Sequence, residues 1–247
     1  MKLKTTLEMP SARQNLWPML LGWLMLLFTY LGALLLLLSD SVALRVGGGL
    51  FFAFKGLTWL VTFLAVLVRP RLGWRLFVGR YLYDSSQHHF WRAMLQAFTR
   101  FWWELPQLWA GYVVSQWRVI FGQIDRVESL GGVTFAIAEK SSGGVSMGMS
   151  LGPYVNIWLP EGVIGDFDLH VRLHSGQLLM HEFGHTVDSM RWGWLYLPVI
   201  GLPSLLSQWV ELVTRGCCHQ HRHLYAERWA NRNAQHYFGI KMRDLQA

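Results

Sequence analysis

The chain has 247 residues, of which 52% are hydrophobic and only 15% are charged, and its formal net charge is +7. Soluble domains carry about 25% charged residues, so this composition argues against an ordinary water-soluble protein. Much of the positive charge flanks apolar segments and no nucleic-acid-binding motif accompanies it, so we expect no nucleic-acid partner. The two cysteines, Cys217 and Cys218, are adjacent, which excludes a disulfide framework.

The first apolar segment, residues 16–38, contains no charged side chain. As a helix it reaches about 34 Å, and the hydrocarbon core of a bilayer is about 30 Å thick. The basic residues Lys2, Lys4 and Arg13 before it resemble the start of a signal peptide. The apolar run is too long for such a peptide and no cleavage-site pattern follows it. We therefore predict a transmembrane helix.

A second apolar segment, residues 46–68, carries one lysine, Lys55, near its middle. A lysine at that depth costs about 3 kcal/mol on insertion scales, but the rest of the segment is apolar and a basic run closes it. We predict a second transmembrane helix, and the positive-inside rule places both ends of the hairpin in the cytoplasm. Residues 1–80 are thus expected to anchor a multi-pass protein in the lipid bilayer of a bacterial inner membrane. The closing basic run consists of Arg69, Arg71, Arg75 and Arg80.

Residues 81–247 are predicted to form one domain on the cytoplasmic side, in which helices surround a short β-sheet. The uncharged run 192–210 contains two prolines and is compatible with a membrane span, a re-entrant loop or a buried hairpin. The fold class is therefore α+β, mainly helical, with an N-terminal transmembrane hairpin. From apolar periodicity and turn residues, the predicted helices are 85–105, 107–121, 173–190 and about 220–238, and the predicted strands are 133–139, 145–150 and 154–159.

The sequence HEFGH, which begins at His181, combines two histidines four residues apart with a glutamate after the first. Residues four apart share one face of a helix, so His181 and His185 can bind the same metal ion. Glu182 projects about 100° around the helix, where its carboxylate can accept a proton from an attacking water. The ligand types favour one Zn²⁺ per chain.

A catalytic zinc needs a third protein ligand, and Glu227 lies on the last predicted helix, well after His185. The two segments together resemble the thermolysin-like zincins, or gluzincins, whose third ligand is a glutamate on a later helix. This resemblance covers about 35 residues, and it implies that His181, His185 and Glu227 bind the metal. The alternative is that Glu227 is a surface carboxylate paired with Arg228 or Arg232.

The residues that follow the motif separate this chain from another zincin family. Metzincins carry a glycine and a third histidine where this sequence has Asp188 and Arg191. Asp188 lies on the same helical face as His181, and we expect it to bond to a ligand rather than to the ion.

The resemblance also implies a strand and an electrophile at the site. In zincins an edge strand beside the motif helix pairs with extended substrate, and segment 145–150 or 154–159 can serve. The residue that stabilises the developing oxyanion is expected to be His223 or Tyr225. The nearby cluster Cys217, Cys218, His219, His221 and His223 fits no closed zinc site and is expected to be a polar loop.

The predicted function is therefore a membrane-anchored zinc metallopeptidase that hydrolyses peptides or proteins, with Glu182 as the general base. One alternative is an intramembrane protease similar to the site-2 family, which the apolar run 192–210 favours. The Leu-Asp-Gly motif of that family is missing, however, and charged Asp188 and Arg191 follow the motif. The other alternative is a non-catalytic membrane protein with a structural metal site, which would need a fourth protein ligand.

Overall fold

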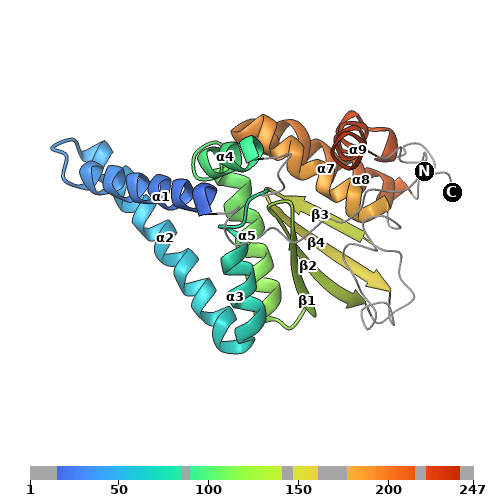
Figure 1. Cartoon of the computed structure of the whole chain (residues 1–247), viewed down its shortest axis with the longest axis horizontal. Helices are drawn as coiled ribbons and strands as arrows, with labels where there is room; N and C mark the ends of the chain where they lie inside the picture. Colours follow the sequence, from blue (N-terminus) through green and yellow to red (C-terminus); the bar gives the residue numbers. More distant parts are fainter. Residues whose placement is uncertain (1–15, 85–89, 141–146, 161–176, 215–220, 240–247) are drawn as a thin grey trace. The chain divides into compact units, whose positions relative to one another are not determined.

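The structure is a computed structural model that describes residues 16–84, 90–140, 147–160, 177–214 and 221–239. It is mostly helical and contains one small four-stranded sheet (Figure 1), which confirms the predicted balance of helices and strands. The chain forms two compact units, residues 1–102 with 112–134, and residues 103–111 with 135–247. Much of segment 81–134, which the sequence analysis grouped with the C-terminal domain, therefore belongs to the unit that contains the N-terminal helices.

The first unit begins with two long apolar helices, α1 (Leu16–Leu37) and α2 (Val42–Val68), which pack against each other as a hairpin (Figure 1). Gly48 permits their close approach, because a Cβ there would lie 2.8 Å from the carbonyl oxygen of Ala33. Both helices are long and apolar enough to cross a membrane, as predicted.

Three further helices follow in this part of the chain: α3 (Pro70–Gly79), α4 (Phe90–Thr99) and α5 (Leu105–Ile120). In the sequence the basic run after residue 68 is predicted only as a membrane flank. Its apolar residues instead form the buried face of α3, where Leu76 and Phe77 are buried while Arg71 and Arg75 are exposed. Helix α4 is shorter than the predicted helix 85–105, whose first five residues lie outside the described ranges. Helix α5 matches the predicted 107–121.

The sheet consists of β1 (Arg126–Leu130), β2 (Val133–Lys140), β3 (Met147–Leu151) and β4 (Tyr154–Pro160), in the order β1-β2-β4-β3. Strands β3 and β4 are antiparallel, and Ser150 pairs with Val155 across them. Their turn uses Gly152, whose φ of 59° favours glycine. The three predicted strands are present, and β3 is an edge of the sheet. Strand β1 was not predicted, because its sequence RVESL is short and half-charged.

The second unit contains helix α7 (Gln177–Trp192), the 3₁₀ turn η2 (Gly193–Leu195), the π-helical turn η3 (Leu197–Gly201), α8 (Leu202–Thr214), the 3₁₀ turn η4 (His221–His223) and α9 (Tyr225–Phe238). Helix α9 ends at Gly239, which adopts the left-handed conformation with φ of 64°. Residues 197–210 of the uncharged run continue through Glu211 to Thr214 as one helical segment, Leu197–Thr214, while residues 192–195 end α7 and form η2. Segment Leu197–Thr214 is the third helix of the described residues that is long and apolar enough to cross a membrane.

Candidate metal centre

Helix α7 holds the HEFGH motif in the core of the second unit. The helix packs against α9 and against strands β3 and β4. Because residues 181 and 185 are one turn apart, their imidazole rings lie together, with centroids 4.9 Å apart and planes at 86°. His185 and Glu182 are buried, and His181 is half-buried. The motif thus lies at the protein interior, where water competes weakly for its side chains.

Glu227 on α9 reaches both histidines through one carboxylate oxygen. Its Oε2 lies 2.9 Å from Nε2 of His181 and 3.4 Å from Nε2 of His185. Three donors that share a tetrahedral zinc at 2.0–2.1 Å are about 3.3 Å apart, so these separations suit a common ion. The ligand atoms of His181, His185 and Glu227 all lie within 4.8 Å of one another, and this group could hold a metal ion.

The tautomer of His181 also suits a metal ligand. Its Nδ1 lies 2.8 Å from Oδ1 of Asn231, and an amide oxygen can only accept, so Nδ1 donates the hydrogen. Nε2 is therefore the ring nitrogen that faces Glu227, and it offers a lone pair to a metal ion once the proton that it shares with Glu227 is displaced. A hydrogen bond from the far ring nitrogen is the usual way in which proteins orient a metal-binding histidine.

Buried Glu227 requires a positive charge beside it. Burial raises the pKa of Glu227, but hydrogen bonds from His181 and His185 outweigh this effect and the net shift is downward. Burial likewise lowers the pKa of His181, while the hydrogen bond to Glu227 and the charges of Glu182 and Glu227 raise it to about 9. A proton shared between these groups and a divalent cation meet the same electrostatic need, so the donor set fits a metal.

The approach of α9 to α7 depends on Gly184, inside the motif. A Cβ at this position would lie 2.0 Å from the carbonyl oxygen of Ala230, so the two backbones are nearly in contact. Ala226, Ala230 and Ala234 are all fully buried along the facing side of α9. Small residues on both helices therefore bring Glu227 within reach of the histidines.

Outside the metal group, which consists of His181, His185 and Glu227, polar side chains also join α7 and α9. Asn233 donates to Oδ1 of Asp188 at 2.6 Å and accepts from Arg191 at 2.8 Å. Burial raises the pKa of Asp188 more than His185 and Asn233 lower it. Asp188 thus contacts Asn233 of α9, and the expected hydrogen bond from Asp188 to a metal ligand is not found among the described residues.

The other carboxylate oxygen of Glu227, Oε1, has partners of its own. Ser204 on α8 donates to it at 2.6 Å, and Nε2 of His221 lies 3.3 Å away. Burial lowers the pKa of His221 more than the charges of Glu227 and Glu211 raise it. These contacts hold the carboxylate so that Oε2 faces His181 and His185.

Glu182 is held by strand β3 rather than by the metal group. The hydroxyl of Ser150 lies 2.5 Å from Oε2 of Glu182. Gly148, two residues earlier on the same face of β3, leaves room for this carboxylate, because a Cβ there would lie 2.3 Å from Oε1. Tyr196 supports the strand by donating to the carbonyl of Ser150 at 3.1 Å. Burial raises the pKa of Tyr196 well above its ordinary value, and nearby carboxylates add to this.

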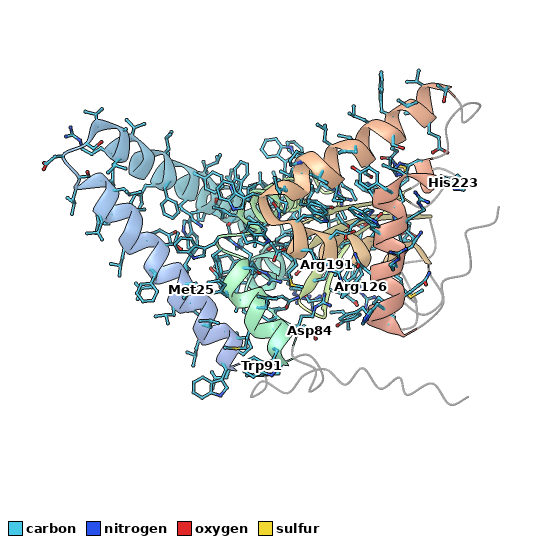
Figure 2. The ribbon with its side chains drawn as sticks, turned by 90° about the horizontal axis from the view of Figure 1, so that it is seen from above. Met25, Asp84, Trp91, Arg126, Arg191 and His223 are labelled. Atoms are coloured by element: carbon cyan, nitrogen blue, oxygen red, sulfur yellow. The ribbon has the colours of Figure 1, made fainter. Side chains whose placement is uncertain are left out.

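The two residues proposed for oxyanion stabilisation lie apart from these contacts. The hydroxyl of Tyr225 donates to the carbonyl of Val199, and its ring packs on Trp229 with centroids 5.2 Å apart. His223 is exposed at the end of η4, on the outside of the fold in Figure 2. The same turn brings His221, not His223, to Glu227. Cys217, Cys218 and His219 lie outside the described residues.

Four residues of this site were not identified from the sequence: Gly148, Ser150, Ser204 and His221. A signal existed for two of them. A glycine inside a β-prone segment often marks a close approach by another group, and Ser204 is a polar residue within a long apolar run. Ser150 carries no local signal, since its partner is 32 residues away in the chain. His221 was noted only within the cluster 217–223, where nothing local indicated that it would reach Glu227.

No family model, no curated protein and no solved structure matches this chain. The function of the site is therefore inferred from its own geometry.

Proposed function

We propose that this protein is a membrane-anchored, zinc-dependent metallopeptidase related in its site to the gluzincins. One observation carries the proposal: Oε2 of Glu227 meets Nε2 of both His181 and His185, while Glu182 is held separately beside them. Three protein ligands with an adjacent carboxylate that is not itself a ligand are typical of hydrolytic rather than structural zinc sites.

The chemistry divides between the metal and the chain. A zinc ion held by His181, His185 and Glu227 would supply Lewis acidity, which polarises a carbonyl and makes water more acidic. Glu182 would accept a proton from the water whose oxygen attacks the peptide carbonyl carbon. It would then give that proton to the nitrogen as the C–N bond breaks, leaving a carboxylic acid and an amine. The bond from Ser150 aims the Glu182 carboxylate for this transfer.

The position of β3 supports a peptide as substrate. Strand β3 is an edge of the sheet and packs against α7, so its outer backbone groups can pair with an extended chain. Gly148 and Ser150 place this edge beside Glu182. A peptide added to β3 would therefore bring a backbone carbonyl next to the general base.

The apolar helices support substrates at the membrane. Helices α1, α2 and Leu197–Thr214 are each long and apolar enough to span a bilayer, and Ser204 of α8 donates to the ligand Glu227. The motif helix α7 is not one of the candidate spans among the described residues. Charged Asp188 and Arg191 follow the motif on α7, so we propose cleavage at the membrane surface rather than within the bilayer.

The decisive test is Glu182→Gln in the full chain, purified in detergent and loaded with zinc. We expect zinc content to remain at one per chain, because Glu182 is not a ligand. We expect peptide hydrolysis to fall by about 10²–10⁴-fold, since the general base is lost. Both would be measured on the same preparations, by elemental mass spectrometry and by mass spectrometry of a defined peptide mixture. Undiminished cleavage by Glu182→Gln, or no cleavage by the zinc-loaded wild type, would rule out this function.

A second prediction concerns the position of the general base. In Gly148→Ala the new methyl occupies the space of the Glu182 carboxylate, so the carboxylate must move while the metal ligands stay in place. A displacement of about 1 Å can cost about 100-fold in rate. We expect zinc content to be unchanged and hydrolysis to fall by that factor. Met147→Ala, an exposed position on the same strand, is the matched control. Equal activity of the two variants would contradict the assigned role of Glu182.

A further inference from the structure

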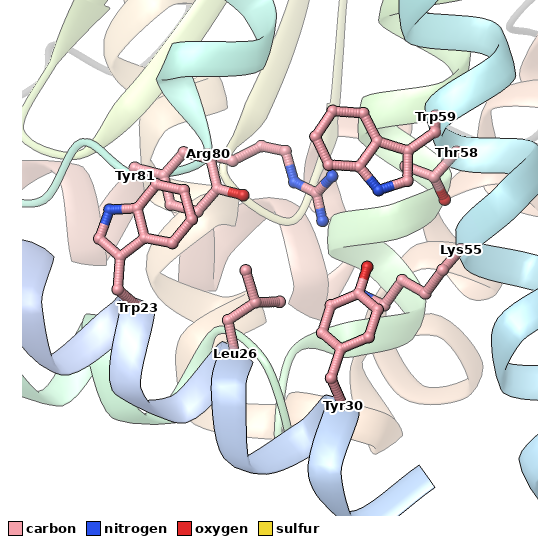
Figure 3. Close-up of a pocket in the computed structure, with 8 residues that line it drawn as sticks. All are labelled: Trp23, Leu26, Tyr30, Lys55, Thr58, Trp59, Arg80 and Tyr81. Carbon is pink, nitrogen blue, oxygen red and sulfur yellow. The ribbon is translucent and has the colours of Figure 1, made fainter. Parts of the chain in front are cut away.

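The first unit contains a cavity of about 340 Å³ that is separate from the metal group. Figure 3 shows its lining, with side chains of α1 facing side chains of α2 and of the segment that ends α3. The volume lies in the range of small-molecule sites. The lining residues are Trp23, Leu26, Tyr30, Lys55, Thr58, Trp59, Arg80 and Tyr81.

Two cationic side chains face this cavity, and no described acidic residue pairs with either of them. Lys55 is 5% exposed and Arg80 is 6% exposed. None of the lining residues is acidic, and among the described residues neither cation forms a salt bridge. The two are also close enough to repel each other. Buried cations normally have a carboxylate or another anion beside them, so this pair indicates an anionic ligand.

Aromatic rings offset only part of this charge. The ammonium group of Lys55 lies 5.3 Å from the ring centroid of Phe51, and the guanidinium of Arg80 lies 4.6 Å from that of Tyr112. The Nε atom of Arg80 is buried with no hydrogen-bond partner among the described residues. The polar part of the cavity therefore offers donors that an oxyanion would satisfy.

The rest of the cavity is apolar and opens towards the outside of the helices. Trp23 stacks on Tyr81 with ring centroids 4.7 Å apart, yet it remains 48% exposed, and Trp59 is 54% exposed. Both tryptophans lie on helices that are apolar enough for a membrane, so their exposed faces are suited to lipid. A ligand that fills the cavity must combine an anion with apolar chains.

The cavity lies beside the middle of α2, where the end of α3 meets it. Helix α3 folds back along α2, where Gly73 comes within contact of the backbone of Ala65. This return brings Arg80, at the end of α3, to the level of Lys55. The exposed arginines Arg71 and Arg75 lie on the same short helix. The end of α3 therefore adds a second cation, which faces the same cavity as Lys55.

We propose that this cavity binds the phosphate group of an anionic phospholipid between Lys55 and Arg80, with its acyl chains along Trp23 and Trp59. An anionic phospholipid and free phosphate both offer a phosphate oxyanion, but only the lipid also has apolar chains for the apolar walls. This site is independent of the metal centre and of the peptidase function.

The test compares three probes on the full chain in a non-ionic detergent. The probes are phosphatidylglycerol, phosphatidylcholine with the same acyl chains, and inorganic phosphate. We expect native mass spectrometry to show phosphatidylglycerol bound, and the thermal unfolding midpoint to rise with that lipid alone, because a ligand of the folded state stabilises it. An equal effect of phosphatidylcholine would overturn the anion site, and an equal effect of inorganic phosphate would overturn the lipid as its ligand.

Variants separate this site from general attraction between basic protein and acidic lipid. Lys55→Met should weaken phosphatidylglycerol binding at least tenfold. Arg71→Gln, which removes an exposed charge from α3, should leave it unchanged. Without lipid, Lys55→Met should unfold at the same temperature as the wild type or higher, because it removes a buried and repelled charge. Arg80→Gln removes the other cation of the cavity, which follows α3 rather than lying on an apolar helix, and it should also weaken phosphatidylglycerol binding. Wild-type binding by both Lys55→Met and Arg80→Gln would refute the proposal.

Discussion

Replacing Glu227 by glutamine is expected to remove zinc from the protein and, with it, all hydrolytic activity. The amide keeps the shape of the side chain, but it loses the negative charge on the oxygen that lies 2.9 Å and 3.4 Å from the two histidines. Two neutral imidazoles alone bind zinc weakly compared with a three-ligand site. We therefore expect zinc content to fall from about one per chain to near zero after gel filtration, as measured by elemental mass spectrometry.

Two matched variants test whether Glu227 acts as a ligand or only as a buried charge. Ser204→Ala and His221→Ala each remove a partner of Oε1 without touching Oε2. Changes of this kind cost about 10–100-fold in metal affinity, so both proteins should still hold zinc, with weaker competition against a chelator. Complete loss of zinc in His221→Ala would show that His221 is a ligand and would favour a closed, structural site. Zinc retained in Glu227→Gln would exclude Glu227 as the third ligand.

Replacing Gly184 by alanine is expected to destabilise the second unit and to disrupt the metal centre. In an exposed helix, alanine is about 1 kcal/mol more favourable than glycine, so helix propensity alone predicts a more stable protein. Here the added methyl would lie 2.0 Å from a backbone oxygen of α9, and backbone cannot turn aside as a flexible side chain can. Overpacking of this kind costs about 1–3 kcal/mol or more, which reverses the sign.

The effect of Gly184→Ala on metal binding depends on the distance between α7 and α9. If α9 moves away to relieve the contact, Glu227 moves away from His181 and His185. We expect Gly184→Ala to lower the unfolding midpoint and to lose zinc. Gly201→Ala is the matched control, because a Cβ at that helical position meets its nearest neighbour at an ordinary 3.6 Å. Equal stability and zinc content in the two variants would mean that the helices do not depend on this contact.

Much of the fold follows from local patterns that the sequence displays directly. The apolar lengths of 16–38 and 46–68 predict α1 and α2, because a long run with at most one charge has few alternatives to a buried or membrane helix. The glycine-bounded β-prone runs predict β2, β3 and β4. Helix α3 and strand β1 were missed because their charged residues hide short apolar faces. Those faces become significant only when a neighbouring element covers them.

The residues of the candidate site also fall into those that local sequence predicts and those that only packing brings together. His181, Glu182 and His185 can be identified from spacing alone, because one turn of helix fixes their relative positions whatever surrounds them. Whether Glu227 joins them cannot be read from spacing. It depends on Gly184 and Ala230 letting two helices touch, and on Ser204 and His221 orienting the carboxylate. The same holds for Gly148, which is significant only because Glu182 lies against it.

The sequence by itself thus determined the apolar helices, the strand segments and the helical half of the metal motif, since each arises from contacts within one element. Only the tertiary structure decided that Glu227 reaches the histidines, that β3 is an edge strand beside Glu182, and that Lys55 and Arg80 face one cavity. Those outcomes depend on close packing between segments distant in the chain. Such packing is set by the shapes of both partners together, and neither segment carries it alone.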